Sequence, residues 1–187
     1  MPKAEDGPAP SRGLGRPTWI AISVVAVVVA ATLAVAFAGV GSGGAGPEVG
    51  QPAPAFRLDL YGGGTLHSDA LRGQVVVLHF WGSWCDPCRE EAPTLRRLWE
   101  DYAPRGVQFV GVAYKDVEAK ARAFLEQYGL GFPNGPDTRL EVSRAYRVRA
   151  VPETYLIAPD GTLVYKYIGP LDEAHFRRTV EGLLQTQ

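Results

Sequence analysis

The stretch FWGSWCDPCREEAP, residues 80–93, decides the fold of this 187-residue chain. Residues 75–80 before it form an apolar run broken only by His79, which is typical of a strand buried on both faces. Beyond the cysteines, residues 87–102 have the apolar spacing of a helix, with one face formed by Ala92, Leu95, Leu98, Trp99 and Tyr102. The sequence therefore predicts that a strand ends, a short turn follows, and a helix begins at the cysteines.

Both cysteines of the chain, Cys85 and Cys88, lie in this stretch. A helix N-terminus carries free N–H groups and positive dipole character, so it favours a thiolate over a thiol. We expect Cys85 to face outward as the attacking nucleophile and Cys88, one turn further on, to be the buried resolving thiol. Pro87 lacks an N–H and suits the first helical turn. Asp86 places a negative charge beside the thiolate, which favours a reducing protein.

A C-x-x-C pair also occurs in sites of other kinds. Zinc would need two more Cys or His ligands, and the remaining candidates, His67, His79 and His175, are scattered along the chain. Covalent haem attachment needs a His directly after the second cysteine, where this chain has Arg89. An inert structural disulfide stays open as an alternative, although a bond that closes so small a loop adds little stability.

Strand and helix patterns alternate through residues 55–187, where we expect the folded domain. Glycines separate two short strands at 56–60 and 65–67, which indicates a hairpin. Pro159-Asp160-Gly161 is a turn signal between two further strands. The sequence predicts an α/β fold with a central mixed sheet and helices on both faces. The other expected strands cover 107–114, 154–157 and 163–168, and the other expected helices cover 117–128, 138–146 and 172–184.

An uncharged apolar segment from Thr18 to Val40 precedes this domain. As a helix it is long enough to cross a bilayer core of about 30 Å. Lys3, Arg12 and Arg16 come before it and the next basic residue is Arg57, so the positive-inside rule places the N-terminus in the cytoplasm and the domain outside. We expect a single-pass protein of a bacterial cell membrane. Its parts would be a cytoplasmic tail at 1–17, a transmembrane signal anchor at 18–40 and a flexible linker at 41–54.

A cleaved signal peptide is the competing interpretation of this segment. Ala34-Val35-Ala36 and Ala36-Phe37-Ala38 both resemble the small-residue sites that signal peptidases cleave. The apolar run is longer than the apolar region of about 7–15 residues that signal peptides usually have, which favours the uncleaved anchor. On either interpretation the domain reaches an oxidising compartment, where a disulfide persists.

The charge balance excludes one class of partner. The chain carries 19 Lys and Arg against 20 Asp and Glu, for a formal net charge of −1. Nucleic-acid binding needs a clustered basic excess. We therefore expect no nucleic-acid partner.

The string FWGSWCDPCREEAP resembles the active site of the thioredoxin-like family. A second string, VPETYLIAPDGTL at 151–163, resembles the family's other signature, a cis-proline that precedes a strand. The resemblance covers roughly residues 50–185 and is greatest with the anchored extracytoplasmic branch, the thiol:disulfide interchange proteins of cytochrome c biogenesis (CcmG/DsbE type) and their ResA and TlpA relatives. Three shorter strings point to the CcmG/DsbE group: VGVAYKD at 110–116, Pro-Glu-Thr at 152–154 and Ile-Gly-Pro-Leu at 168–171.

The resemblance implies an activity. Such proteins reduce the cysteines of oxidised apocytochrome c before haem attachment, with electrons from a membrane dithiol donor. They use no cofactor other than their redox-active disulfide, here Cys85–Cys88. A general extracytoplasmic protein disulfide reductase or oxidase is the alternative. A peroxidase on the same fold is a third hypothesis, and a non-catalytic tethered binding module a fourth. The direction of electron flow depends on the reduction potential, which the sequence does not give.

The resemblance also assigns roles around the cysteines. It implies that Pro152 is cis and that the backbone of Val151 is free to pair with a substrate strand. Trp81 and Trp84 are expected to shape an apolar substrate surface around Cys85, with ordinary packing as the alternative, and the two roles are compatible. Glu153 is expected either to face the site or to be an exposed strand residue.

Two further residues are candidates for proton transfer. Glu91, three positions after Cys88 on the same helical face, is expected either to exchange a proton with Cys88 or to be a solvated helix residue. His79 departs from the family, because thioredoxins have a buried acid there and this branch usually has Asn. We expect a hydrogen-bonded core residue, with a proton relay as the alternative.

Overall fold

The computed structural model describes residues 25, 27, 29 and 46–185. The chain divides into two units, Met1–Gly44 and Ala45–Gln187. In the first unit only Val25, Val27 and Val29 are described, each of them helical and exposed. The expected tail at 1–17 and nearly all of the expected anchor at 18–40 lie outside the described residues. Among the residues that are described, no helix combines the length and apolar character needed to span a membrane.

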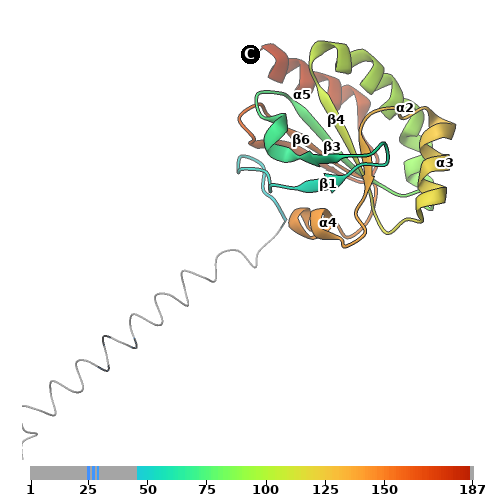
Figure 1. Ribbon diagram of the computed structural model, residues 1–187. Coiled ribbons are helices and arrows are strands. Elements are labelled where there is room, and N and C mark those ends of the chain that lie inside the picture. Colours follow the sequence, from blue (N-terminus) through green and yellow to red (C-terminus); the bar gives the residue numbers. More distant parts are fainter. Residues whose placement is uncertain (1–24, 26, 28, 30–45, 186–187) are drawn as a thin grey trace, which may run out of the picture. The chain divides into compact units, whose positions relative to one another are not determined.

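The folded unit is built on a five-stranded sheet with the order β5-β4-β3-β6-β7. The central strand is β3, which pairs in parallel with β4 and antiparallel with β6, so the sheet is mixed as predicted. A separate hairpin pairs β1 with β2 (Figure 1). The strands of the sheet are β3 (Val76–Trp81), β4 (Gln108–Ala113), β5 (Asn134–Pro136), β6 (Glu153–Ile157) and β7 (Leu163–Ile168), and those of the hairpin are β1 (Arg57–Asp59) and β2 (Thr65–His67).

Both faces of the sheet are covered, and the α/β fold is confirmed. Residues of the helices α2 (Asp86–Tyr102), α3 (Glu118–Tyr128) and α5 (Glu173–Gln185) share one apolar core with the side chains of β3 that face α2. The second core, on the opposite face, is formed with α4 (Glu141–Tyr146) and the β1–β2 hairpin. In Figure 1, α2 and α5 lie on one side of the sheet and α4 on the other. Two short 3-10 helices complete the unit, η1 (Ser68–Leu71) and η2 (Ala103–Arg105).

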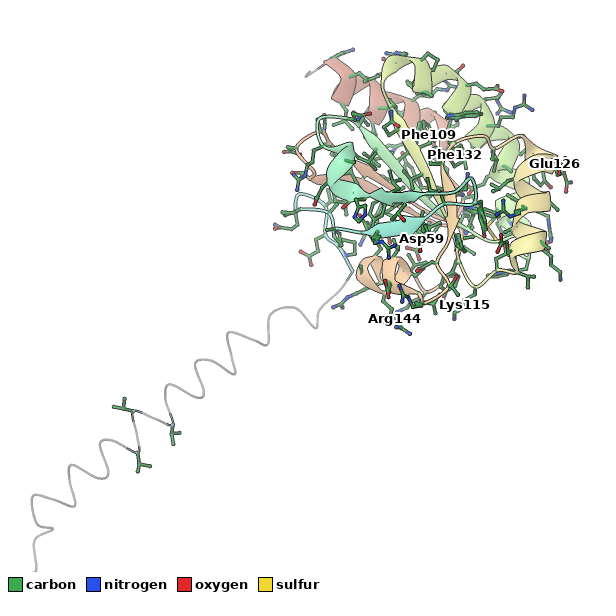
Figure 2. All side chains as sticks on the ribbon, in the orientation of Figure 1. Asp59, Phe109, Lys115, Glu126, Phe132 and Arg144 are labelled. Atoms are coloured by element: carbon green, nitrogen blue, oxygen red, sulfur yellow. A yellow bond between two sulfur atoms is a disulfide. The ribbon has the colours of Figure 1, made fainter. Side chains whose placement is uncertain are left out.

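Alternation along β3 decides which residues meet α2. Successive side chains of a strand point to opposite faces. Val77 and Trp81 belong to the core beneath α2, while Leu78 and Phe80 belong to the other core. His79 therefore points toward α2, where the cysteines are. Farther along this face, Phe109 and Phe132 pack with ring centroids 5.8 Å apart, whereas Glu126 lies at the surface (Figure 2).

The start of the folded unit differs from the expected linker at 41–54. Backbone hydrogen bonds join Gly50 N to Leu163 O at 2.8 Å and Leu163 N to Gln51 O at 2.9 Å, and Ala53 N to Gly161 O at 2.9 Å. The described part of the expected linker is thus bound along β7 and the turn before it. The physical reason is that β7 is an edge strand, whose free N–H and C=O groups accept a further extended segment.

Candidate active site

A disulfide joins Cys85 and Cys88 four residues after the end of β3, where α2 begins. Cys85 is the N-cap residue of α2, with an extended backbone, and its Sγ accepts a hydrogen bond from Cys88 N at 3.2 Å. Pro87 lies in the first turn, where its missing N–H leaves no intrahelical bond unmade. The predicted strand–turn–helix arrangement is therefore present, with a redox-capable pair at the helix N-terminus.

Exposure does not distinguish the two sulfurs in the disulfide form. Cys85 is 4% exposed and Cys88 is 2% exposed, so the expected outward-facing Cys85 is in fact buried here. The reason is that the segment before Pro152 covers it: the carbonyl oxygen of Val151 lies 3.4 Å from Cys85 Sγ. This is a contact and not a hydrogen bond in the disulfide, because the sulfur carries no proton. In the dithiol the Cys85 thiol has this carbonyl as an acceptor.

The Val151–Pro152 peptide bond is cis, as the resemblance implies. Pro152 O accepts a hydrogen bond from Gly169 N at 2.9 Å, which ties the proline to the end of β7. Trp84, next to Cys85, is 51% exposed, so an exposed apolar side chain lies beside this sulfur. Ile168 is also exposed, but it lies opposite Glu153 in the β6–β7 register and therefore points to the other face of the sheet.

The loop before Cys85 is held in place by the segment that follows β4. Asp116 Oδ1 accepts a hydrogen bond from Ser83 Oγ at 2.7 Å, and Asp116 Oδ2 accepts one from Ser83 N. Trp84 Nε1 donates to the carbonyl of Tyr114 at 3.2 Å. Arg89 of α2 donates to the carbonyl of Ser83 and pairs with Asp86. This ion pair offsets the negative charge that Asp86 was expected to place beside the thiolate.

Trp81 does not have the position expected for a substrate-binding residue. Its side chain is 1% exposed, stacks on Phe124 with centroids 4.7 Å apart, and donates from Nε1 to Asn134 Oδ1 at 3.0 Å. A Cβ on Gly111 would lie 1.7 Å from that oxygen, so this glycine makes room for the bond. The reason for the difference is the pleat: Trp81 is the last residue of β3 and faces the core under α2, whereas Trp84 in the loop faces solvent.

Glu91 is buried, 8% exposed, and its Oε2 accepts a hydrogen bond from Leu171 N at 2.9 Å. The solvated helix residue considered from the sequence is therefore wrong. Burial raises the pKa of Glu91 to about 7, against the smaller lowering effect of the Leu171 N–H. Its other oxygen, Oε1, has no hydrogen-bond partner among the described residues. Glu91 is thus a buried carboxyl one helical turn from Cys88 that titrates near neutral pH.

His79 is 2% exposed and lies next to Glu91. Its Nδ1 is 2.9 Å from Thr154 Oγ1, and its Nε2 is 3.5 Å from Glu91 Oε1. Burial lowers the pKa of His79 to about 3, so the ring is neutral at neutral pH and the contact with Glu91 is not an ion pair there. The hydrogen-bonded core histidine expected from the sequence is confirmed. Nothing in the sequence pattern placed it beside Glu91.

Glu153 faces away from the cysteines. It lies opposite Phe80 in the β3–β6 register, on the face of the sheet that packs on α4. The side chain is 6% exposed, and its Oε2 accepts a hydrogen bond from Tyr155 Oη at 2.6 Å. Glu153 is therefore neither a residue of the site nor an exposed strand residue, and both expectations from the sequence are wrong. The residue after Pro152 points to the opposite face from Thr154, which contacts His79.

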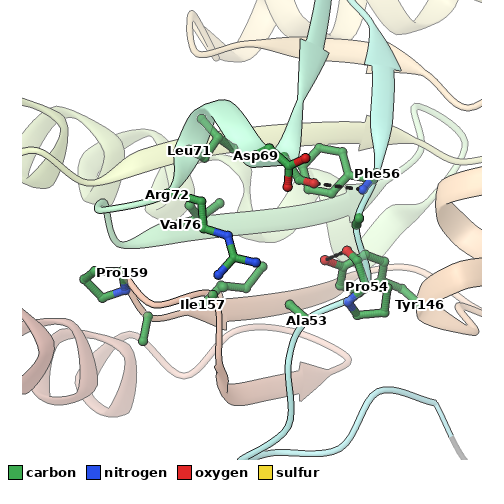
Figure 3. A pocket seen from close by; sticks show the side chains of 14 residues that line it. Ala53, Pro54, Phe56, Asp69, Leu71, Arg72, Val76, Tyr146, Ile157 and Pro159 are labelled. Atoms are coloured by element: carbon green, nitrogen blue, oxygen red, sulfur yellow. Dashed lines mark hydrogen bonds between the residues drawn. The ribbon is translucent and has the colours of Figure 1, made fainter.

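The pocket of Figure 3 is a different feature from the cysteine site. It is lined by Val76 at the start of β3 and Ile157 at the end of β6, and so lies at the other end of the sheet from Cys85. Arg72 crosses one side of it and donates to the carbonyl of Asp160. Among residues 46–185 and the three described valines, no cluster of His, Cys, Asp and Glu has the makings of a metal site.

Sequence reasoning missed three residues that hold the site: Asp116, Thr154 and Leu171. All three residues lie in the short strings at 110–116, 152–154 and 168–171 that carry the resemblance, but the resemblance gave none of them a role. Leu171 contributes only its backbone N–H, for which the sequence has no signal.

Comparison with known proteins agrees with this geometry. The model of the AhpC/TSA family matches residues 49–166. Thiol-disulfide oxidoreductase ResA of Bacillus cereus (strain ZK / E33L) is 33% identical over 138 residues, which cover 74% of this chain and 78% of that protein. Two solved structures share the fold. A thiol:disulfide interchange protein of Chlorobium tepidum TLS has a TM-score of 0.66 at 27% identity, covering 73% of this chain and 98% of that one.

The second is a secreted Mycobacterium tuberculosis disulfide oxidoreductase that is homologous to E. coli DsbE. It has a TM-score of 0.63 at 26% identity and covers 68% of this chain and 96% of that one. The disulfide at the helix N-terminus, the cis-proline against it and these likenesses lead to one conclusion: the chain belongs to the AhpC/TSA family, with a thioredoxin-like fold, and is a thiol-disulfide oxidoreductase of the ResA and DsbE type.

Proposed function

We propose that this chain is a membrane-anchored extracytoplasmic disulfide reductase that reduces apocytochrome c cysteines before haem attachment. The observation that carries the disulfide-exchange part is the buried carboxyl of Glu91 one turn from Cys88, with a pKa raised to about 7, whereas the reducing direction is proposed from the likeness to ResA and DsbE-type proteins. Oxidation of the dithiol requires a base for the Cys88 proton. A carboxyl with a pKa near the working pH is suited to accept it.

The reaction takes two exchange steps. Cys85 thiolate attacks one sulfur of the client disulfide, so that a Cys85–client disulfide forms and the client's other sulfur leaves as a thiolate. Cys88 then gives its proton to the Glu91 carboxylate and attacks Cys85 Sγ. The Cys85–Cys88 disulfide forms and the second client sulfur leaves as a thiolate. The client gains two electrons, and a dithiol donor later returns them to the enzyme.

The surface around Cys85 suits an extended client. Trp84 beside Cys85 is exposed, and Val151, whose carbonyl oxygen lies 3.4 Å from Cys85 Sγ, is only partly buried. The haem-attachment segment of an apocytochrome, C-x-x-C-H, is short enough to lie across this surface in extended form. The apocytochrome client itself is proposed from the likeness to ResA and DsbE-type proteins and from the strings at 110–116, 152–154 and 168–171.

The membrane location is proposed from the sequence. The uncharged segment 18–40 follows three basic residues, and no further basic residue occurs until Arg57. Such an order places a domain that follows the segment outside the cytoplasm. A partner for recycling would then be a membrane dithiol protein.

The test is a pair of measurements on the full chain in detergent. The Cys85–Cys88 reduction potential should lie below about −180 mV, the value for protein disulfide isomerase, because a reductant must be more negative than the oxidising catalysts around it. The dithiol enzyme should reduce an oxidised C-x-x-C-H peptide at least about tenfold faster than a C-x-x-C-A peptide with the same flanks. Equal rates with both peptides would instead support the general reductase. A potential near −120 mV, that of a strong oxidant, would refute the reductase.

A further inference from the structure

The pair formed by His79 and Glu91 is buried between β3 and the first turns of α2. The nitrogen Nε2 and the oxygen Oε1 are 3.5 Å apart, and both residues are less than a tenth exposed. Glu91 Oε1 has no other hydrogen-bond partner among the described residues. A buried carboxyl oxygen without a donor costs free energy, and it costs more when the group is ionised. A proton between Glu91 Oε1 and His79 Nε2 would remove this cost.

A single proton placed between these two atoms completes the site. With this proton carried on Glu91 Oε1, the histidine tautomer that completes the site has its proton on Nδ1, facing Thr154 Oγ1 at 2.9 Å, and leaves Nε2 as the acceptor. Burial sets where that proton resides, since it lowers the pKa of His79 to about 3 and raises that of Glu91 to about 7. The ring is thus the acceptor and the carboxyl is the proton carrier.

Among residues 46–185, the elements packed around this pair bring no other charged side chain to bear on it. From α2 the neighbouring titratable group is Cys88, and the strand β4 presents Gly111 opposite His79. From β6 comes Thr154, and opposite it on β7 lies Tyr167, whose hydroxyl is engaged with His175 Nδ1 at 2.6 Å. The segment before α5 supplies the Leu171 N–H to Glu91 Oε2. Cys88 is therefore the group with which Glu91 is placed to exchange its proton.

We propose that His79 is a positioning residue for disulfide exchange: its Nε2 accepts the hydrogen bond of the protonated Glu91 carboxyl, which makes Glu91 a strong enough base to take the Cys88 proton. The balance of the step is simple. The S–H bond of Cys88 breaks and an O–H bond forms on Glu91, and His79 neither gains nor loses a proton. The Cys88 thiolate then attacks Cys85 Sγ and expels the client thiolate. Thr154 fixes the ring by accepting from Nδ1–H, which keeps Nε2 free as an acceptor.

This inference rests on the disulfide-exchange activity and not on the proposed client, so any oxidised dithiol peptide serves in the test. The full-length dithiol enzyme is mixed with such a peptide. The rate at which the second peptide thiol is released is measured over a range of pH values, in the parent and in His79→Asn. In parallel, the Glu91 carboxyl of the disulfide form is titrated by carbon-13 NMR.

His79→Asn should move the Glu91 midpoint to lower pH, because an amide N–H donates to the ionised carboxylate where Nε2 accepted from the acid. The release step should follow: its midpoint shifts to lower pH by the same amount, and its high-pH plateau falls about tenfold, since a weaker base accepts the proton more slowly. The first attack by Cys85 should stay within about twofold of the parent. A packing defect alone would slow release at every pH without moving the midpoint.

Thr154→Val gives a second, independent variant in case His79→Asn does not fold. Without the hydroxyl, the ring can place its proton on Nε2, and the Glu91 midpoint should move in the same direction by a smaller amount. Ser143→Ala, which removes a buried hydroxyl on α4, is the control and should leave both titrations unchanged. If the Glu91 midpoint coincides with that of the parent in every His79 or Thr154 variant that folds, the proposal is wrong.

Discussion

Ser83 Oγ donates a hydrogen bond of 2.7 Å to Asp116 Oδ1, across a gap of 33 residues in sequence. The same carboxylate accepts the backbone N–H of Ser83, and its Oδ1 accepts that of Val117 at 2.8 Å. One side chain thus joins the loop before Cys85 to the start of α3. The position of Cys85 at the N-terminus of α2 depends on this loop, because only Trp84 separates it from Ser83.

The first prediction follows from that link. Asp116→Ala should lower the free energy of unfolding by about 1–3 kcal/mol, the cost of leaving buried donors without an acceptor. It should also speed reduction of the Cys85–Cys88 disulfide by a small thiol, because losing these bonds frees the loop that holds the buried Cys85 against the Val151 carbonyl. Urea denaturation and stopped-flow reduction measure the two effects.

The control for this prediction is Asp172→Ala. Asp172 Oδ1 accepts from His175 N at 2.9 Å in the first turn of α5, so its loss removes a helix cap and should also destabilise the fold. It should leave the rate of disulfide reduction unchanged. Equal reduction rates in both variants would show that Asp116 does not control access to Cys85.

The strand–turn–helix around the cysteines was predictable because its signals are local. An apolar run, a turn and a helical spacing follow one another within residues 75–102. The strand β5, Asn134–Pro136, was missed for the opposite reason. Asn-Gly-Pro is a turn signal by composition, and only pairing with β4 makes it a strand.

The contacts of the site were less predictable than its motif. His79 and Glu91 lie on a strand and a helix, and periodicity gives which face each residue is on within its own element. It does not give the rotation of the helix about its axis relative to the strand, which decides whether two side chains meet. The depth of Trp81 and the direction of Glu153 also had to come from the structure, because alternation along a strand does not say which face of the sheet the helix with the cysteines covers.

The order of the two cysteines is the second prediction. Cys85 should be the attacking sulfur, because it caps α2 and its Sγ accepts the Cys88 N–H at 3.2 Å, a bond that favours a thiolate. Cys88→Ser should therefore accumulate a mixed disulfide between Cys85 and a client. Cys85→Ser should accumulate little, and non-reducing gels followed by mass spectrometry would show the difference. Comparable trapping by both variants would reverse or abolish the assignment.

The third prediction concerns the N-terminal segment. If residues 18–40 anchor the chain, protease added to spheroplasts should digest the domain, and the N-terminal tail should still be attached to the intact protein in mass spectra. The basis is the uncharged segment behind Lys3, Arg12 and Arg16. A mature N-terminus at Phe37 or Gly39 would instead establish cleavage. A lysed sample, in which protease reaches both sides, is the control for sidedness.

The fourth prediction is a pH dependence of stability that comes from His79. Its pKa of about 3 in the folded protein is below the ordinary value of 6.5, so the unfolded chain binds more protons between these values. The parent therefore loses stability as the pH falls through this window. His79→Asn removes that loss, and its free energy of unfolding should gain on the parent by up to about 1.4 kcal/mol for each unit of pH lowered.

The cleanest window for this measurement lies between about pH 4.5 and pH 3.5. There Glu91, with a pKa of about 7 in the folded chain, is already protonated. In the unfolded chain, where its ordinary pKa is 4.5, it goes from half protonated at pH 4.5 to nearly fully protonated at pH 3.5, so its opposing contribution shrinks toward the lower end of the window. Urea denaturation of the parent, His79→Asn and Ser143→Ala at several pH values provides the comparison. Parallel curves for the parent and His79→Asn would show that His79 is not held neutral by burial.

The last prediction separates Glu91 from its neighbour on the helix. Glu91 is buried with a pKa raised to about 7, whereas Glu90 is exposed. Glu91→Gln keeps the size and the hydrogen bond from Leu171 N but cannot accept a proton, so release of the mixed disulfide by Cys88 should slow by about 10²–10⁴-fold. Attack by Cys85 should change little, since the N-terminus of α2 still favours its thiolate. The pH dependence of the release step should also flatten near pH 7, because the group that titrates there is gone.

The control for this prediction is Glu90→Gln, which should reproduce the parent in both steps. In the double variant Glu91→Gln with His79→Asn, the second change should add nothing, because His79 acts through Glu91. Release within about twofold of the parent in both the single and the double variant would mean that water accepts the Cys88 proton.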